Sequence, residues 1–120
     1  MRDPLIAVVG VCAAGKSTLV AGLRAQGWNA RQVVQEHSYV PGMWQRITDP
    51  DVLIYLDASL DTIRLRRRDP EFPPWIFEQE TIRLRHAQLH CDLYVDTDPL
   101  TPEQVLEIAI SWLSENTGSF

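Results

Sequence analysis

The segment from Gly10 to Ser17 has the residue types and spacing of a phosphate-binding loop. It fits the pattern G-x-x-x-x-G-K-[ST], in which glycines let successive backbone N–H groups turn inward and surround a phosphate. In this pattern the lysine, Lys16, reaches the β- and γ-phosphates of a nucleotide, and the hydroxyl of Ser17 binds Mg²⁺. We therefore predict phosphate contacts from Gly10, Ala13, Ala14, Gly15, Lys16, Ser17 and Thr18.

Two acidic residues are candidates for binding the metal or activating an attacking hydroxyl. Glu36 follows the apolar pair 33–34, and Asp57 ends the apolar run 52–56, so we expect both at the ends of strands. A carboxylate there could bind Mg²⁺ directly or through water, or accept the proton of the hydroxyl. The sequence leaves open which of the two serves the metal. Asp57 could instead hydrogen-bond the N-terminus of the next helix.

The composition is that of one globular domain over residues 1–120. Eleven Lys and Arg residues against sixteen Asp and Glu residues give a net charge of −5, which disfavours binding to a nucleic-acid polymer. Two cysteines are too few for a disulfide framework, and the apolar run at 5–9 is too short for a signal or membrane-spanning segment. We therefore expect a cytoplasmic protein without a membrane partner.

Strand and helix patterns alternate along the chain, which is the order of an α/β fold. The continuous apolar runs at 5–9 and 52–56 are typical of strands buried on both faces. We expect strands at 5–9, 30–36, 52–56 and 92–96, and helices at 16–26, 59–68, 76–90 and 101–114. Right-handed crossovers then give a mostly parallel sheet of about four strands with helices on both faces. Ligands bind beyond the carboxyl ends of such strands, where the phosphate loop, Glu36 and Asp57 fall.

Four stretches of the sequence together resemble the small P-loop kinases, among them the shikimate, gluconate and adenylate kinases. The stretches are the phosphate loop, the strand 52–57 with Ala58 and Ser59 after it, the arginine-rich segment 64–68 and the ending Leu93–Thr97. The resemblance implies a three-layer P-loop NTPase fold and a Mg²⁺-dependent enzyme that transfers the γ-phosphoryl group of ATP. The acceptor would be a small molecule with a hydroxyl or phosphate group, and a nucleoside, a nucleotide and a sugar-like alcohol all remain open.

In these kinases an arginine-bearing lid closes over the transferred phosphoryl group, and the segment of about 64–85 corresponds to it here. By its distance from Asp57, Arg67 resembles the lid arginine. By its distance from Asp92, Arg83 resembles the arginine that holds the acceptor or a phosphate. Arginines stabilise the negative charge that spreads over equatorial oxygens during phosphoryl transfer. They could instead form a solvated helix face paired with nearby acidic residues.

The chain departs from these kinases between its second and third predicted strands. Only residues 38–51 intervene there, too few for the crossover helix and extra strand that the family usually carries. We therefore expect the second strand to lie next to the phosphate-loop strand, which would bring Glu36 beside Ser17. A pocket this abbreviated could need a second copy of the chain, as in a homodimer. The alternative function is a nucleotide-binding or slowly hydrolysing NTPase or sensor module without a small-molecule acceptor.

Several further side chains could do chemistry but have an ordinary structural explanation. Tyr39, Trp44 and Trp75 could stack on a base or cover an acceptor, or could pack in the core or the lid. His86 and His90 are spaced four apart on a predicted helix, as in a metal-binding pair. No spaced third ligand completes that pair.

Overall fold

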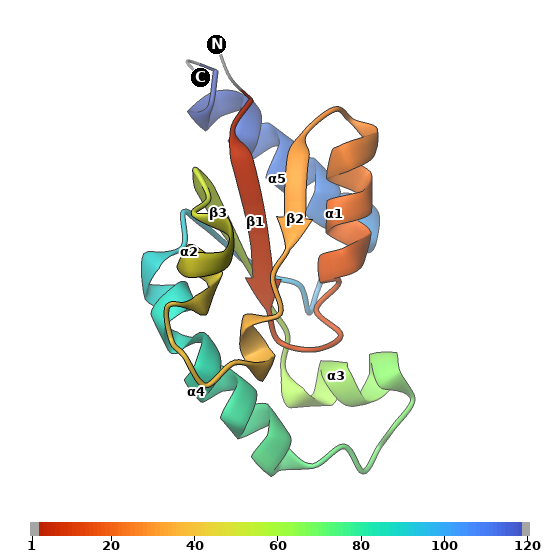
Figure 1. Ribbon diagram of the computed structural model, residues 1–120. Coiled ribbons are helices and arrows are strands. Elements are labelled where there is room, and N and C mark those ends of the chain that lie inside the picture. The colour runs from red at the N-terminus through yellow and green to blue at the C-terminus, as the bar shows by residue number, and fades with distance from the viewer. Residues whose placement is uncertain (1–2, 119–120) are drawn as a thin grey trace.

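Residues 3–118 are described by the computed structural model, which shows an α/β fold built on one four-stranded sheet (Figure 1). The strands are β1 (Leu5–Gly10), β2 (Asn29–Gln32), β3 (Val52–Asp57) and β4 (Leu93–Asp96). Their order in the sheet is β2-β1-β3-β4, and each neighbouring pair is parallel. This confirms the predicted parallel sheet, with the second strand beside the phosphate-loop strand.

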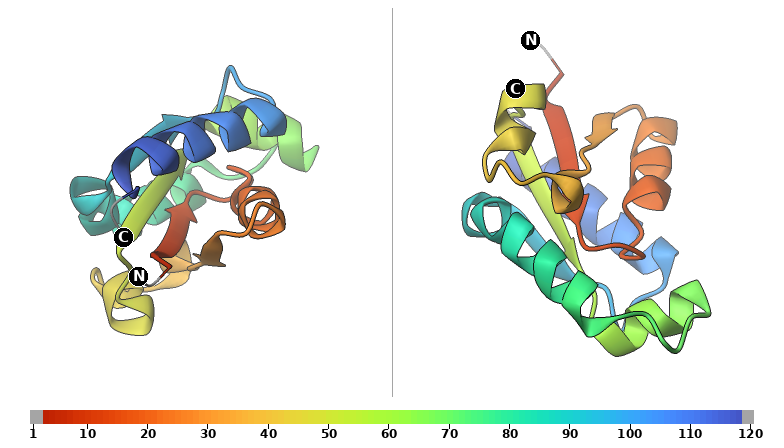
Figure 2. Two further views of the ribbon diagram at one scale, coloured as in Figure 1. Left: turned by 90° about the horizontal axis from the view of Figure 1, so that it is seen from above. Right: turned by 60° about the horizontal axis from the view of Figure 1, so that its bottom comes forward.

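Helices cover both faces of the sheet (Figure 2). The helices α1 (Lys16–Ala25) and α5 (Pro102–Asn116) pack against each other on one face. The helices α2 (Met43–Thr48) and α4 (Pro74–His90) lie on the other face, where both contact β1 and α4 also contacts β3. β1 and β3 are therefore buried on both sides, which explains why their sequences are apolar without alternation.

Two short helices lie beyond the end of the sheet toward which the strands point (Figure 1). They are the 3₁₀ helix η1 (Gln35–His37) and the helix α3 (Leu60–Arg67). The helix α3 begins where the side chain of Ser59 accepts a hydrogen bond from the N–H of Thr62, which satisfies one of the free donors at its N-terminus. Together with the loops after β1 and β4, these helices bring polar residues to one edge.

The second strand is shorter than predicted. It ends at Gln32, although the N–H of Val33 still donates to the carbonyl of Val8, and the chain then turns into η1 instead of continuing to residue 36. The cause is the fully buried side chain of Gln35. Its Oε1 accepts the N–H of Trp44, and its Nε2 donates to the carbonyl of Arg83, so it connects three separate segments. These bonds are long-range, and a local pattern does not predict them.

The helix α4 starts at Pro74, two residues before its predicted start at 76. A proline suits the first turn of a helix because it has no N–H to leave unpaired there. The other predicted helices and strands agree with the structure to within one or two residues at each end. Across residues 3–118, no helix combines the length and the apolar character needed to span a membrane.

Candidate phosphate-binding site

The loop between β1 and α1 has the backbone geometry that its glycines permit. A Cβ atom at Gly10 would lie 2.2 Å from the carbonyl oxygen of Leu56, so only glycine fits where the two strands meet. Gly15 has a φ of 94° and Ala13 a φ of 58°, both in the left-handed region. Glycine adopts that region freely, whereas alanine pays a steric cost, so tertiary packing holds Ala13 there.

Several backbone donors of this loop have no acceptor. Gly15 is the N-cap of α1 and has no side chain to cap the helix, and the first helical bond runs from the Leu19 N–H to the Gly15 carbonyl. The N–H of Ala14 donates to the carbonyl of Val11, which closes the turn. In this loop and the first turn of α1, the N–H groups of Ala13, Gly15, Lys16, Ser17 and Thr18 have no hydrogen-bond partner among the described residues. Such a set of converging donors at a helix N-terminus suits an anion.

The side chain of Lys16 is folded back into the loop and is only 5% exposed. Its Nζ donates to the carbonyl oxygens of Gly10 at 3.0 Å and Val11 at 2.9 Å. It also lies 2.9 Å from Oε2 of Glu36. The sheet order therefore brings Glu36 to the loop, as predicted, but its ion pair there is with Lys16. Among the described residues, no contact is found between Glu36 and Ser17.

Glu36 is itself buried and incompletely paired. Its side chain is 4% exposed, and its second oxygen, Oε1, has no hydrogen-bond partner among the described residues. Beside it, Nη1 of Arg83 donates to the Glu36 carbonyl at 3.2 Å, and the Arg83 guanidinium lies 4.3 Å from the centre of the Tyr39 ring. The Nε of Arg83 is also buried without a partner. An unpaired acceptor and an unpaired donor thus lie close to the ammonium of Lys16.

Arg67 and Arg66 lie next to each other in sequence but have different surroundings. Arg67, the predicted lid residue, ends α3 with its guanidinium 4.9 Å from the centre of the Phe72 ring. Arg66 reaches the phosphate loop instead: its Nη1 donates to the carbonyl of Ala13 at 2.9 Å. Its Nη1 and Nη2 also donate to the hydroxyl and the carbonyl of Thr97, at 2.9 and 2.8 Å.

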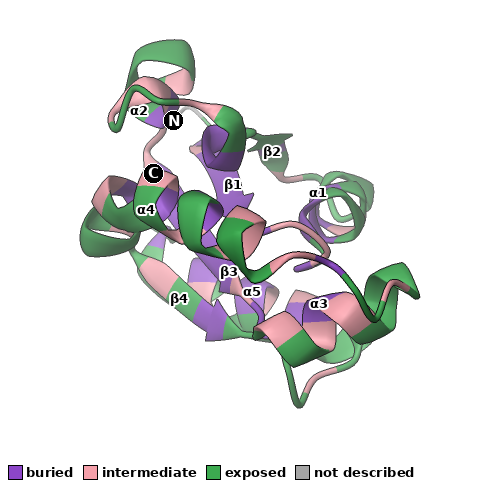
Figure 3. Ribbon diagram, turned by 90° about the horizontal axis from the view of Figure 1, so that it is seen from below, coloured by how far each residue is buried: buried purple, intermediate pink, exposed green. Residues whose placement is uncertain are grey.

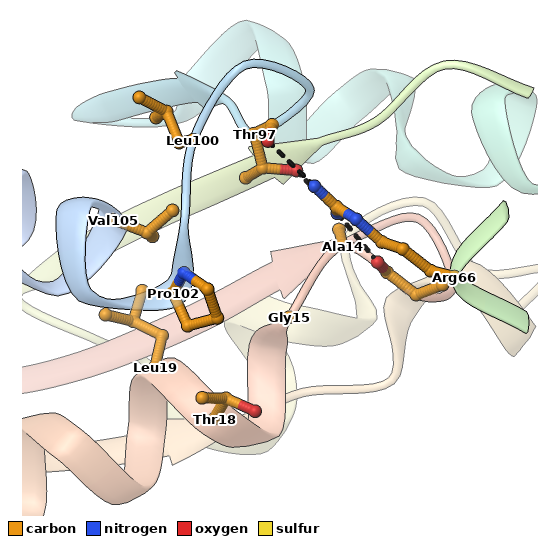
Figure 4. A pocket seen from close by; sticks show the side chains of 10 residues that line it. Ala14, Gly15, Thr18, Leu19, Arg66, Thr97, Leu100, Pro102 and Val105 are labelled. Carbon is orange, nitrogen blue, oxygen red and sulfur yellow. Dashed lines mark hydrogen bonds between the residues drawn. The ribbon is translucent and has the colours of Figure 1, made fainter. Parts of the chain in front are cut away.

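A cavity of about 140 Å³ opens beside Arg66, between the phosphate loop and the segment that joins β4 to α5 (Figure 4). Its walls are mostly apolar and include Leu19, Leu100, Pro102 and Val105, with Thr18 at the start of α1. Neither this cavity nor the contact of Arg66 with the loop was predicted from the sequence. The signal was present, because the residues after β4 follow the carboxyl end of a parallel strand, as Gly10 does.

Asp57 is engaged away from the phosphate loop. Its Oδ1 accepts a hydrogen bond from the N–H of Ala58 at 2.9 Å, and its Oδ2 accepts one from the hydroxyl of Tyr94. The Tyr94 ring stacks on that of Tyr55, with centroids 5.6 Å apart. Burial, followed by the hydrogen bond to Asp57, raises the pKa of the Tyr94 phenol above its usual value. Both carboxylate oxygens therefore have partners.

The aromatic and histidine candidates separate into buried and exposed groups. Trp44 is buried, and its Nε1 donates to Nδ1 of His86. The His86 and His90 rings lie 4.4 Å apart, next to that tryptophan. Tyr39 and Trp75 are exposed. In the described part of the chain, no group of three or more His, Cys, Asp and Glu side chains is arranged to hold a metal ion.

A second buried acid, Glu80, also contacts the phosphate loop. Its Oε1 accepts the N–H of Cys12 at 2.8 Å, and the residue is 2% exposed. Burial, followed by the negative charge of Glu80 and a hydrogen bond to it, raises the pKa of the Cys12 thiol to about 11. Glu80 could not be singled out from the sequence, because its burial depends on where α4 crosses the end of the sheet.

No protein-family model matches this chain, and no curated protein is significantly similar to it in sequence. The chemistry of the site is therefore argued from its geometry. It offers unpaired backbone donors, a buried ammonium and a buried carboxylate with one unpaired oxygen. Beside this group, Arg66 and Arg83 donate to the carbonyls of Ala13 and Glu36. Such an arrangement suits a polyphosphate together with a hard cation.

Proposed function

We propose that this protein has a P-loop NTPase fold and transfers the γ-phosphoryl group of ATP, with Mg²⁺, to a small acceptor. The observation that carries the proposal is the set of unpaired N–H groups around the buried ammonium of Lys16. These donors converge at a helix N-terminus where the loop curls around one point, and a phosphate would satisfy them together. The acceptor presents a hydroxyl or a phosphate group.

The cavity beside Arg66 supports a nucleotide rather than a simple phosphate. It shares Ala13, Gly15 and Thr18 with the phosphate loop, so a base in the cavity and phosphates on the loop can belong to one molecule. Apolar walls and a planar guanidinium suit a flat ring, which can stack on arginine. We propose ATP as the donor, since the sequence has no motif of the kind that reads guanine.

The residues present fit a magnesium ion. Mg²⁺ prefers oxygen ligands and keeps several waters, and the exposed hydroxyl of Ser17 with the unpaired Oε1 of Glu36 provides such oxygens. Asp57 fits this role less well, because both of its oxygens already accept hydrogen bonds. When bound, the ion would neutralise charge on the β- and γ-phosphates.

The side chains of the chain then have separable roles. On nucleotide binding, Lys16 exchanges its carbonyl acceptors and Glu36 for phosphate oxygens. The freed Glu36 carboxylate would accept the proton of an acceptor hydroxyl at Oε1, or would help to hold Mg²⁺ through water. Arg83, with its unpaired Nε, and Arg67, on the lid segment, stabilise negative charge on the transferred group or the acceptor.

A second candidate is a nucleotide-binding or slowly hydrolysing NTPase or sensor module. It is favoured by the short segment between η1 and β3, which holds only the six-residue helix α2, whose Trp44 is buried. That segment offers little surface for an acceptor. The two candidates are separated by incubating the protein with Mg²⁺ and ATP, with and without a pool of nucleosides, nucleotides and sugars. ADP release that depends on the pool supports the kinase, and equal release without the pool contradicts it.

A further inference from the structure

Glu80 reaches the phosphate loop from α4, the helix that lies across the end of the sheet where β1 leads into the loop (Figure 3). Its carboxylate accepts the N–H of Cys12 and is almost completely buried. The contact therefore joins the lid segment, of which α4 is one side, to the first half of the loop. None of the roles proposed above uses it.

The negative charge of Glu80 is not needed to hold the loop. Its carboxylate accepts hydrogen bonds from the N–H and the thiol of Cys12, and within residues 3–118 it forms no ion pair with a lysine, arginine or histidine. A glutamine in the same place would accept the same N–H with its amide oxygen. It would also avoid the free-energy cost of burying a charge without a partner. A buried charge at this position therefore points to an effect on whatever binds the loop.

Glu80 bonds the loop at Cys12, next to the residues that hold the ammonium of Lys16. The Nζ of Lys16 is held by the carbonyls of Gly10 and Val11, the two residues directly before Cys12. In loops of this pattern the backbone donors hold the α- and β-phosphates, and the lysine reaches the β- and γ-phosphates. A third phosphate consequently comes closer to Glu80 than the first two do.

We propose that Glu80 is a specificity-determining residue that sets the relative affinity of the site for nucleoside triphosphate and diphosphate. This inference rests on the proposed nucleotide-binding function. The carboxylate repels the γ-phosphate and so offsets part of the attraction that Lys16 supplies, whereas the α- and β-phosphates are less affected. As a result, the protein binds ATP and ADP with similar affinities, because the charge of Glu80 offsets the extra attraction for the γ-phosphate.

The test is calorimetric titration of the intact protein with ATP and with ADP in magnesium buffer. Glu80→Gln removes the charge and keeps an acceptor for Cys12, and Glu80→Asp keeps the charge but shortens the side chain. Glu78→Gln is the matched control, because Glu78 is an exposed acid on the same helix. We expect Glu80→Gln to raise the affinity for ATP relative to ADP by about tenfold, and Glu78→Gln to leave the ratio unchanged. We expect Glu80→Asp to keep the wild-type ratio.

The outcomes separate this inference from the function on which it rests. If the wild-type chain binds neither nucleotide, the proposed function is wrong and the inference falls with it. If the wild type binds both but Glu80→Gln changes both affinities equally or not at all, only the inference is overturned. The wild-type ratio tests it even if Glu80→Gln does not fold: a preference for ATP over ADP of about a hundredfold or more would contradict it.

Discussion

Removing the charge of Glu36 should destabilise the free protein and at the same time strengthen its hold on polyphosphate. In the free protein Lys16 and Glu36 form a buried pair at 2.9 Å, with side chains 5% and 4% exposed. Deleting one partner of such a pair typically costs about 3–5 kcal/mol, because the other charge remains buried. In Glu36→Gln the cost is lower, about 2 kcal/mol, since the glutamine oxygen and two backbone carbonyls still accept from Nζ.

The assays follow from that estimate. A loss of about 2 kcal/mol should lower the melting temperature by roughly 8 °C in a domain of this size. Because Lys16 no longer has to leave a carboxylate, ATP titrated without magnesium should bind Glu36→Gln about tenfold more tightly than wild type. Turnover with magnesium and acceptor should fall by about a hundredfold or more, because the general base or metal-water ligand is lost.

The matched control is Glu107→Gln, which changes an exposed acid on α5 and should alter none of these quantities. Combining Glu36→Gln with Lys16→Met should show a coupling free energy of about 1–3 kcal/mol between the two sites. Weaker or unchanged binding of metal-free ATP by Glu36→Gln would refute the claim that Glu36 competes with phosphate for Lys16. Full turnover in that variant would refute its catalytic role.

Three other predictions test neighbouring parts of the site. Because the pKa of the Cys12 thiol is raised to about 11, iodoacetamide at pH 8 should label Cys12 about a hundredfold more slowly than a thiol of pKa 9. The labelling rate should rise toward pH 11, and labelling of the native chain at the rate of the unfolded chain would contradict this prediction. Gly10→Ala places a Cβ 2.2 Å from the Leu56 carbonyl and should cost at least about 2 kcal/mol in thermal unfolding, whereas Gly42→Ala, whose nearest neighbour is 3.9 Å away, should cost far less. Arg66→Ala removes a cavity wall and should weaken the affinity for ATP by about tenfold while leaving the affinity for inorganic tripolyphosphate unchanged. Equal losses of affinity for both ligands would show that Arg66 does not contact the base of the nucleotide.

The central elements of the fold could be predicted because their signals are local. The continuous apolar sequences of β1 and β3 indicate strands buried on both faces, and both are found there. The short segment between the second and third strands predicted the place of β2 beside β1, and the sheet order confirms it. The end of β2 was wrong by several residues, since the bonds of Gln35 to distant segments decide it.

The site was only partly predictable for the same physical reason. The loop motif identifies its own residues, and the sheet order brings Glu36 to it. Glu80 and Arg66 act on the loop from α4 and α3, and their contacts with Cys12 and Ala13 depend on how those helices cross the end of the sheet. Spacing along the chain carries no information about such crossings.

The most direct test of the phosphate-binding claim is an NMR titration of backbone amides with ATP and magnesium. The account predicts that the largest shift changes fall on the loop and first-turn amides that lack partners among the described residues, those of Ala13, Gly15, Lys16, Ser17 and Thr18. Smaller changes should appear along the cavity between Thr97 and Val105. Amide shifts that stay unchanged at millimolar nucleotide, or that change only outside this loop, would contradict it.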